Sequence, residues 1–352
     1  MYSPDGGREL TYAQALYEAT AQEMERDPDV FVFGLGVDDP KGMYGTTQDL
    51  HRRFGALRNF DTPLSEDAMT GVAIGAALAG MRPIHVHQRM DFVMLCMNQL
   101  VNLAAKTRYL SGGESSLPMV VRAIIGRSWG QGAQHSQAFH SFFMHVPGIK
   151  VVAPATPYDA KGCMISAIRD DNPVMFIEHR MLYGHRGAVP QEPYSVPFGK
   201  ARVLTRGADV TLVAISHMVV ESLRAYHQLL EAGVEAEVID PVSLAPLDIE
   251  TIDESVRRTG RLLVVDNGWT CAGASAEIVA QIVERHPGDR SLRVRRMGFA
   301  PVPCPTTKPL ELLFYPDARS IAIAAHALVR GASEWQPGVA EAREIAEFKG
   351  PF

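Results

Sequence analysis

The segment that decides the fold reads Asp61-Thr62-Pro63-Leu64-Ser65-Glu66-Asp67-Ala68-Met69-Thr70-Gly71-Val72-Ala73-Ile74-Gly75-Ala76-Ala77-Leu78-Ala79-Gly80. Pro63 directly after Thr62 indicates a turn. A serine that can cap, Ser65, followed by the acidic residues Glu66 and Asp67, is typical of a helix start. The segment therefore predicts a turn and then a helix.

One face of this expected helix carries almost no side chains. Gly71, Gly75 and Ala79 are four residues apart and so lie in line. Each interior glycine costs roughly 1 kcal/mol relative to alanine, so we expect another helix or a flat ligand to approach this face closely. Glu66 lies at the N-terminal end of this face. From spacing alone, Glu66 is equally well explained as a partner of the helix dipole or as a functional acid.

Strand and helix patterns alternate along both halves of the chain. Expected strands are 30–34, 84–87, 119–125, 151–153, 174–177, 210–215, 236–240, 261–265 and 292–297. Expected helices are 11–26, a short one near 50, 92–109, one after 137, 159–169, 218–231, 274–285 and 321–329. Such alternation indicates parallel sheets covered on both faces, hence an α/β chain of two doubly wound domains. We assign residues 1–185 to the first domain, 186–200 to a linker, 201–330 to the second domain and 331–352 to a tail.

Composition narrows the class of protein. A length of 352 residues with 46% hydrophobic and 21% charged residues is typical of a two-domain globular protein. The net charge of -6 argues against nucleic acid as the main partner, and the longest apolar run, 71–81, is too short to span a membrane. The four cysteines form no CxxC motif and the N-terminus has no signal-peptide core. We therefore expect free thiols and a cytoplasmic protein.

The opening segment, continued by Gly80-Met81-Arg82-Pro83-Ile84, resembles the β subunit of thiamine-diphosphate-dependent 2-oxoacid dehydrogenases, such as the pyruvate and branched-chain enzymes. Similar motifs follow in the same order between residues 8 and 330, namely 102–106, 109–113, Gln134-His135-Ser136-Gln137, 146–152, 159–162 and 171–173. The resemblance implies a transketolase-like pyrimidine-binding domain followed by a transketolase C-terminal-type domain.

The resemblance also implies partners. The chain has no GxGxxG after a strand, no P-loop motif, and no Gly-Asp-Gly element of the kind that holds the diphosphate and its metal. In this family that element lies on a separate α chain. The resemblance therefore implies that an α subunit holds most of the diphosphate and Mg²⁺, in a complex of two α and two β chains. A lipoyl transacylase core is a further implied partner.

The family's catalytic residues map onto two positions. Glu66 matches the acid that places a proton on the pyrimidine ring of the cofactor, a task for which a buried carboxyl group is suited because desolvation raises its pKa. His135 matches the histidine that faces substrate and acyl acceptor, since an imidazole can exchange protons near neutral pH. A surface-loop histidine bonded to a neighbouring carbonyl remains the alternative. Further residues that we expect beside the cofactor are Leu64, Gln88, Met90 and Phe92.

Three residues are candidates for contact with substrate: Arg89, His87 and Gln134. Arg89 stands where relatives tend to carry an aromatic residue. Because a lone buried charge is costly, it either meets an acidic group, of the substrate for example, or turns outward while Met90 fills the stacking position. His85 and His87 share one face of a strand and could bind zinc, but no third ligand is visible.

The segment Ala167-Ile168-Arg169-Asp170-Asp171-Asn172 resembles a potassium site of the family. The implied ligands are Ala167, Ile168, Asp170 and Asn172. Capping and turning of the chain is the other explanation for Asp170 and Asn172.

Departures from the family pattern widen the range of functions. Gly34-Leu35-Gly36-Val37 stands where relatives usually have Gly-Glu-Glu-Val, and Val86 where they often have glutamate. The main hypothesis is decarboxylation of a small 2-oxoacid followed by acyl transfer to lipoamide. The alternatives are a carboligating, acyloin-type thiamine diphosphate enzyme and a non-catalytic subunit. Substrate identity stays open because much of the acyl pocket would come from the α chain.

Overall fold

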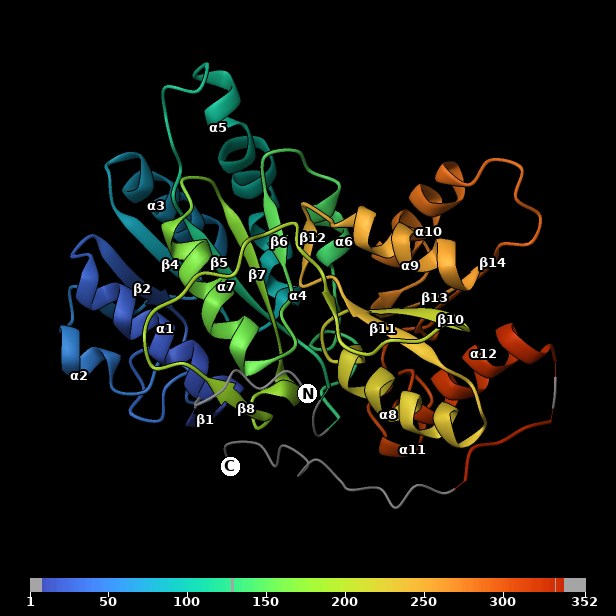
Figure 1. The fold of residues 1–352 in the computed structure, drawn as a ribbon. Helices are drawn as coiled ribbons and strands as arrows, with labels where there is room; N and C mark the ends of the chain where they lie inside the picture. Colours follow the sequence, from blue (N-terminus) through green and yellow to red (C-terminus); the bar gives the residue numbers. More distant parts are fainter. Residues whose placement is uncertain (1–7, 128–129, 333, 339–352) are drawn as a thin grey trace.

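The structure is a computed structural model, and it describes residues 8–127, 130–332 and 334–338. These residues form two α/β units that lie side by side, each built on a mainly parallel sheet (Figure 1). The expected α/β class is confirmed. None of the helices in the described part of the chain is long and apolar enough to cross a membrane.

The first sheet has seven strands in the order β12-β6-β7-β5-β4-β2-β3. Six come from the first half of the chain and are parallel: β2 (Val30–Gly34), β3 (Asn59–Asp61), β4 (Arg82–His87), β5 (Val120–Ile125), β6 (Lys150–Val152) and β7 (Val174–His179). The seventh, β12 (Ser243–Ala245), pairs antiparallel with β6. A segment placed in the second domain by its position in sequence therefore completes the sheet of the first.

Helices cover both faces of this sheet. They are α1 (Tyr12–Arg26), α2 (Leu50–Phe54), α3 (Glu66–Leu78), α6 (His140–Met144) and α7 (Pro157–Arg169), together with the helical path 90–110. The helix expected from the opening segment is confirmed as α3. However, the Ser65 side chain makes no capping hydrogen bond. The turn at Pro63 and the acids in the first turn are thus the signals that mark this helix start.

The second sheet has the order β14-β13-β10-β11-β9. Its strands are β9 (Arg202–Val203), β10 (Val210–Ala214), β11 (Ala236–Asp240), β13 (Arg261–Trp269) and β14 (Arg293–Phe299), and its helices are α8 (Met218–Glu231), α9 (Ile249–Thr259), α10 (Ala274–Arg285), α11 (Lys308–Glu311) and α12 (Ala318–Arg330). Helix α9 is absent from the sequence-based expectation. Its boundary signals are ordinary: the Asp248 carboxylate caps Thr251 N–H, and Gly260 ends the helix in the left-handed region.

The expected linker is partly a strand. Residues β8 (Arg186–Val189) pair antiparallel with β1 (Arg8–Thr11), so both strands form a small separate sheet. The unpaired connection between the units is correspondingly shorter than 186–200. Most of the expected tail, residues 339–352, lies outside the described residues.

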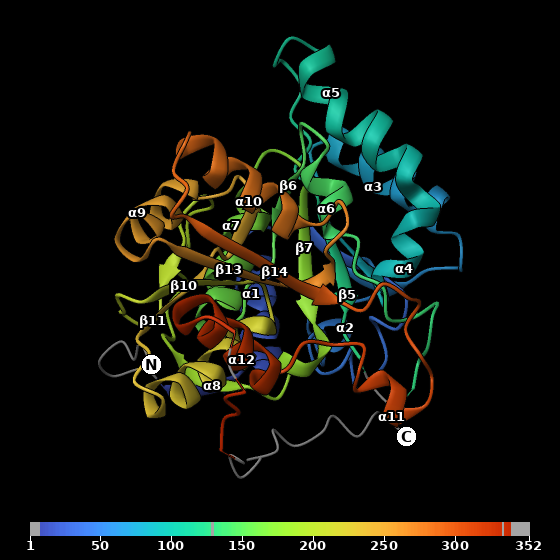
Figure 2. The ribbon, with the colours of Figure 1, turned by 90° about the vertical axis from the view of Figure 1, so that its right-hand side faces the viewer.

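The expectation of a single regular helix at 92–109 is wrong. The path consists of α4 (Met90–Val93), a 3₁₀ turn η1 (Met94–Cys96), a π-helix η2 (Asn98–Ala104) and α5 (Ala105–Leu110). A π-helical stretch is wider than an α-helix, and such stretches often occur near functional sites. This path runs beside α3 on one flank of the molecule (Figure 2).

Alternate strand residues enter two apolar cores. Val30 and Val32 of β2 pack on the side of α1 and α7, in a cluster that continues into α8 and α12. Phe31 and Phe33 pack on the other side, in a cluster that reaches α3, α9 and α10. Because each core runs through both units, the two units are held together by burial of apolar side chains.

Candidate functional site

Three parallel strands end together at the edge of the first sheet where the opening segment begins. Gly34, Asp61 and His87 are the last residues of β2, β3 and β4. Gly34 has a φ of +149°, and a Cβ there would lie 2.3 Å from the carbonyl oxygen of Val86, so only glycine fits. The carboxyl ends of parallel strands are where α/β proteins bind ligands.

The carboxylate of Asp61 orders the loop that follows β2. It accepts the backbone N–H groups of Gly36, Val37 and Asp38 at 3.0, 2.7 and 3.2 Å. This is the loop that lacks the two glutamates of the family pattern. The loop is therefore held by an acid from β3.

Glu66 is the first residue of α3 and is half-buried within this chain. Leu64, two residues before it, is 79% exposed. The expectation of a buried carboxyl group is therefore not met by this chain alone. The carboxyl group of Glu66 would become fully buried only when another molecule docks over Leu64.

The small face of α3 is only partly covered by the chain itself. A Cβ on Gly71 would lie 3.6 Å from the side chain of Gln99 in η2, whereas a Cβ on Gly75 would meet nothing within 4 Å. The close approach expected at this face is therefore made at Gly71 by a neighbouring helix. At Gly75 the face stays open.

The two histidines of β4 are buried and neutral. His85 stacks on Phe33 at 4.6 Å, and its ring lies 4.3 Å from that of His87. Burial lowers the pKa of His87 to about 4 and, with the neighbouring His87 as a smaller cause, lowers the pKa of His85 as well. No group of three His, Cys, Asp or Glu side chains in the described ranges could hold a metal. His87 Nε2 has no hydrogen-bond partner there.

Arg89 does not turn outward, so that expectation is wrong. Its side chain is only 3% exposed, and Nη2 donates to the carbonyl oxygen of Gly126 at 2.7 Å. The nearest carboxylate oxygen, Asp91 Oδ2, is 3.9 Å from Nε. Burial lowers the pKa of Arg89, and both Nε and Nη1 lack hydrogen-bond partners among the described residues. Arg89 therefore holds the start of the loop that begins at Gly126.

Met90 is also corrected by the structure. It is completely buried, and its sulfur accepts the backbone N–H of Phe139 at 3.0 Å. A side chain in that position cannot offer a surface to a ligand. Gln88, by contrast, is exposed and donates to the carbonyl oxygen of Leu35 at 3.1 Å.

His135 is half-buried and meets the ring of Phe92 edge-on, with ring centres 5.3 Å apart and an interplanar angle of 81°. The structure thus brings together two of the expected site residues. Gln134, beside it, is exposed. The imidazole of His135 is held by an aromatic wall on one side and remains accessible on another.

The loop that carries His135 is anchored along its length. Beyond the bond from Arg89 to Gly126, Arg180 Nη1 donates to Gln131 Oε1 at 2.9 Å. Asp91 accepts from the backbone and side chain of Gln137 at 3.2 and 2.9 Å. A Cβ on Gly130 would lie 2.5 Å from the carbonyl oxygen of Thr306, so the second unit also touches the loop.

Neither Asp91 nor Arg180 is marked by the sequence reasoning. Both follow directly, within four residues, the carboxyl end of a buried parallel strand, β4 or β7. That position is the signal that could have found them. Their partners on the loop are visible only in the tertiary structure.

The residues predicted for potassium lie at the end of α7: Ala167, Ile168, Asp170 and Asn172. Arg82 Nη1 donates to the carbonyl oxygens of Ile168 and Asp170 at 3.0 and 3.1 Å. The Asp170 carboxylate pairs with Lys150 and accepts the N–H of Asn172 at 2.9 Å. Two cationic side chains of the chain already contact these oxygens, and Asp170 turns the chain. Potassium stays a prediction here.

Comparisons with known proteins agree with this architecture. The family model described as transketolase, pyrimidine binding domain, matches residues 8–186, and that described as transketolase, C-terminal domain, matches residues 199–321. A solved structure described as a split gene transketolase, inactive β4 tetramer, has a TM-score of 0.74 at 22% identity, covering 91% of this chain and 98% of that chain. This likeness concerns the fold.

Similarity in sequence is closer to β subunits. The chain is 42% identical to the β subunit of acetoin:2,6-dichlorophenolindophenol oxidoreductase from Cupriavidus necator, over 92% of this chain and 98% of that protein. It is 43% identical to the pyruvate dehydrogenase E1 component subunit β of Porphyra purpurea, over 84% of this chain and 90% of that protein. The chain therefore belongs to the family of transketolase-like β subunits that includes those of pyruvate dehydrogenase E1 and of this acetoin oxidoreductase.

Proposed function

We propose that this chain is the β subunit of a thiamine-diphosphate-dependent enzyme that decarboxylates a small 2-oxoacid. In this proposal it contributes Glu66 and His135 to an active site shared with an α subunit. The observation that carries the proposal is the position of Glu66, half-buried at the start of α3 beside the exposed Leu64 and shortly after the carboxyl end of β3. The relatives named as pyruvate dehydrogenase β subunits support the substrate class.

The residues at this edge fit one side of a flat aminopyrimidine. Leu64 presents an apolar side chain, the Phe92 ring is partly accessible, and Glu66 presents a carboxyl group at a helix N-terminus. Bound thiamine diphosphate would supply the carbon nucleophile and take up the electrons released when the substrate loses CO₂. A carboxyl group that becomes buried holds its proton more tightly. Glu66, once covered by an α subunit, would hold such a proton toward the ring nitrogen.

His135 has a separate task in this proposal. Its imidazole, positioned by Phe92 and by the anchored loop, would give a proton to or take one from an oxygen of the substrate. Gln134, exposed next to it, and His87, whose Nε2 lacks a partner, remain our candidates for substrate contact. His87 ends β4, and Gln134 lies in the loop that follows the neighbouring strand β5.

An apolar flank supports the proposed partner. Exposed apolar side chains gather on α3 and on the helical path beside it: Val72, Leu78, Leu95, Leu103, Tyr109 and Leu110. These elements lie together on one side of the molecule (Figure 2). Such a surface is suited to a stable protein interface. We assign it to the α subunit, which would hold the diphosphate and Mg²⁺, in a complex of two α and two β chains.

Lipoamide, presented by a transacylase core, is our first candidate for the acyl acceptor. A carbonyl acceptor of the acyloin type is the second, and the acetoin-oxidoreductase relative, aligned over 98% of its length, specifically favours keeping it. Turnover of the reconstituted complex with lipoamide or with an aldehyde separates the two. A reducing location such as the cytoplasm suits the four free cysteines, of which Cys271 is exposed.

The test of the proposal is Glu66→Gln in the complex with the α subunit. The amide cannot relay a proton, so hydrogen–deuterium exchange at the thiazolium carbon should slow by several orders of magnitude while the complex still assembles. Asp67→Asn makes the same chemical change one residue away, at an exposed carboxylate that contacts Gln99 at 3.2 Å. It should leave exchange unchanged. Exchange as fast as wild type in Glu66→Gln would remove the role assigned to Glu66.

A further inference from the structure

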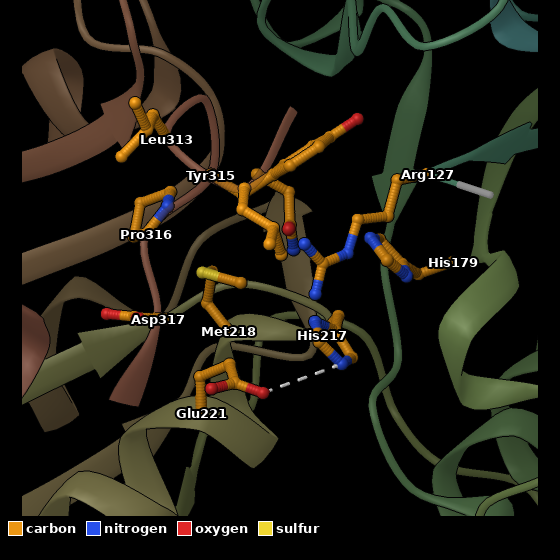
Figure 3. Close-up of a pocket in the computed structure, with 11 residues that line it drawn as sticks. Arg127, His179, His217, Met218, Glu221, Leu313, Tyr315, Pro316 and Asp317 are labelled. Carbon is orange, nitrogen blue, oxygen red and sulfur yellow. Dashed lines mark ion pairs between the residues drawn. The ribbon is translucent and has the colours of Figure 1, made fainter. Parts of the chain in front are cut away.

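A pocket of about 360 Å³ lies where the two units meet, and Glu66 is not among its lining residues (Figure 3). Arg127 and His179 enter it from the ends of β5 and β7 in the first unit. His217, Asn267 and Tyr315 line it from the second unit. A sphere of this volume is about 9 Å across, which is the lower end of the range for small-molecule sites.

Arg127 is a cationic side chain that lines this space. Its guanidinium lies over the ring of Tyr315, 5.3 Å from the ring centre, and extends into the pocket toward His217 (Figure 3). No carboxylate of the described residues is within ion-pair distance of it. A cation held in a cavity without an acidic partner favours an anion there.

The two acids in the wall already have partners on α8 and α12. Glu221 accepts from Arg224 at 2.8 Å and from the backbone N–H of Ala318 at 2.9 Å. Asp317 caps α12 by accepting the N–H of Ser320 at 2.8 Å. Glu221 Oε1 also lies 3.9 Å from His217 Nε2, and neither carboxylate is in an ion pair with Arg127.

Two stacked histidines line the pocket. His179 and His217 stack with ring centres 4.7 Å apart, and both are buried. Burial, with Arg127 as the next cause, lowers the pKa of His217 to about 3. The pKa of His179 is lowered by burial, by His217 and by Arg127. Both rings are neutral at pH 7.

Asn267 contributes a buried oxygen atom that lacks a hydrogen-bond donor. It is 1% exposed and donates from Nδ2 to the carbonyl oxygen of Ile215 at 2.8 Å. Its Oδ1 is buried without a hydrogen-bond partner among the described residues. A buried acceptor of this kind is stabilised by a donor. Met218 and Pro316 make other parts of the wall apolar.

We propose that this pocket binds a small aliphatic hydroxycarboxylate. The carboxylate meets Arg127, the hydroxyl donates to Asn267 Oδ1, and the short carbon chain lies against Met218 and Pro316. None of the residues assigned above to thiamine diphosphate lines this pocket, and the proposal does not depend on that function. It provides the chain with a second binding site at the junction of its two units.

The experiment titrates the full-length chain with lactate, propanoate and acetoin, using calorimetry and NMR of labelled histidine. Lactate should bind and raise the pKa of His217, because a nearby anion stabilises the imidazolium. Propanoate lacks the hydroxyl and should bind several-fold more weakly, and the uncharged acetoin should not bind. Arg127→Gln should weaken lactate binding by about ten- to a hundredfold, the effect of one charge-assisted contact.

Arg206→Gln is the matched control. Arg206 is an arginine of the second unit that pairs with Glu237 at 3.0 Å and does not line the pocket. Its loss should leave lactate binding unchanged. The proposal is overturned if lactate does not bind, if Arg127→Gln binds it as wild type does, or if propanoate or inorganic phosphate binds as well as lactate.

Discussion

Replacing Arg89 by methionine should loosen the loop that carries His135. Methionine has a similar reach but cannot donate, so the 2.7 Å bond from Arg89 Nη2 to the Gly126 carbonyl oxygen is lost. A hydrogen bond from a charged donor contributes about 1.5–3 kcal/mol. With tenfold per 1.4 kcal/mol, this corresponds to about a ten- to hundredfold increase in the open population of the loop.

The global free energy of unfolding should change little in Arg89→Met. In the wild type, two guanidinium nitrogens are buried without hydrogen-bond partners in the described structure, and the closest carboxylate oxygen is 3.9 Å away. Removing this buried charge relieves a desolvation cost that offsets the lost bond. Asp91 keeps its two hydrogen bonds from Gln137.

Two measurements separate this positioning role from direct substrate recognition. Amide hydrogen exchange in 130–137 should accelerate about ten- to hundredfold. In the complex with the α subunit, kcat should fall by a similar factor while KM changes little. The control is Arg58→Met, which removes another arginine bonded to backbone carbonyls, those of Met24, Asp27 and Val30. It should lower stability without affecting loop exchange or kcat. A rise confined to KM would refute the positioning role.

Three further outcomes are expected. Arg122 and Glu178 form a fully buried pair at 2.5 and 2.9 Å. Glu178→Met alone should therefore lower the free energy of unfolding in urea by about 3–5 kcal/mol, whereas the double variant Arg122→Met, Glu178→Met should recover most of this loss. Equal losses of stability in the single and double variants would contradict this. His87 has a folded-state pKa of about 4 against about 6.5 unfolded, so the unfolded chain binds more protons in this window and stability falls as pH drops. Between pH 7 and pH 5, protonation of this side chain should lower the free energy of unfolding by about 2 kcal/mol. His87→Phe should therefore lose about 2 kcal/mol less stability than the wild type over the same pH range. Finally, the isolated chain should show negligible affinity for thiamine diphosphate in calorimetry until the α subunit is added, and micromolar binding by the chain alone would contradict the shared site.

Local signals in the sequence determine most of the secondary structure. Alternating strand and helix patterns, the turn at Pro63 and the acids of the first turn are enough for the α/β class and for α3, because they act over a few residues. The same reasoning misses α9 and expects one regular helix at 92–109. The π-helical stretch η2 lies against α3, a contact between two separate segments of the chain.

The candidate site divides in the same way. Glu66 and His135 can be predicted from motifs, because each sits in a short stretch whose residue types resemble the family. The inward turn of Arg89, the anchoring of Gln137 by Asp91 and the burial of Met90 cannot, because each joins segments that are 37–49 residues apart. The pocket around Arg127 brings together residues from both units. Only the tertiary structure decides these contacts, since the free energy of burying a charge depends on which distant groups meet it.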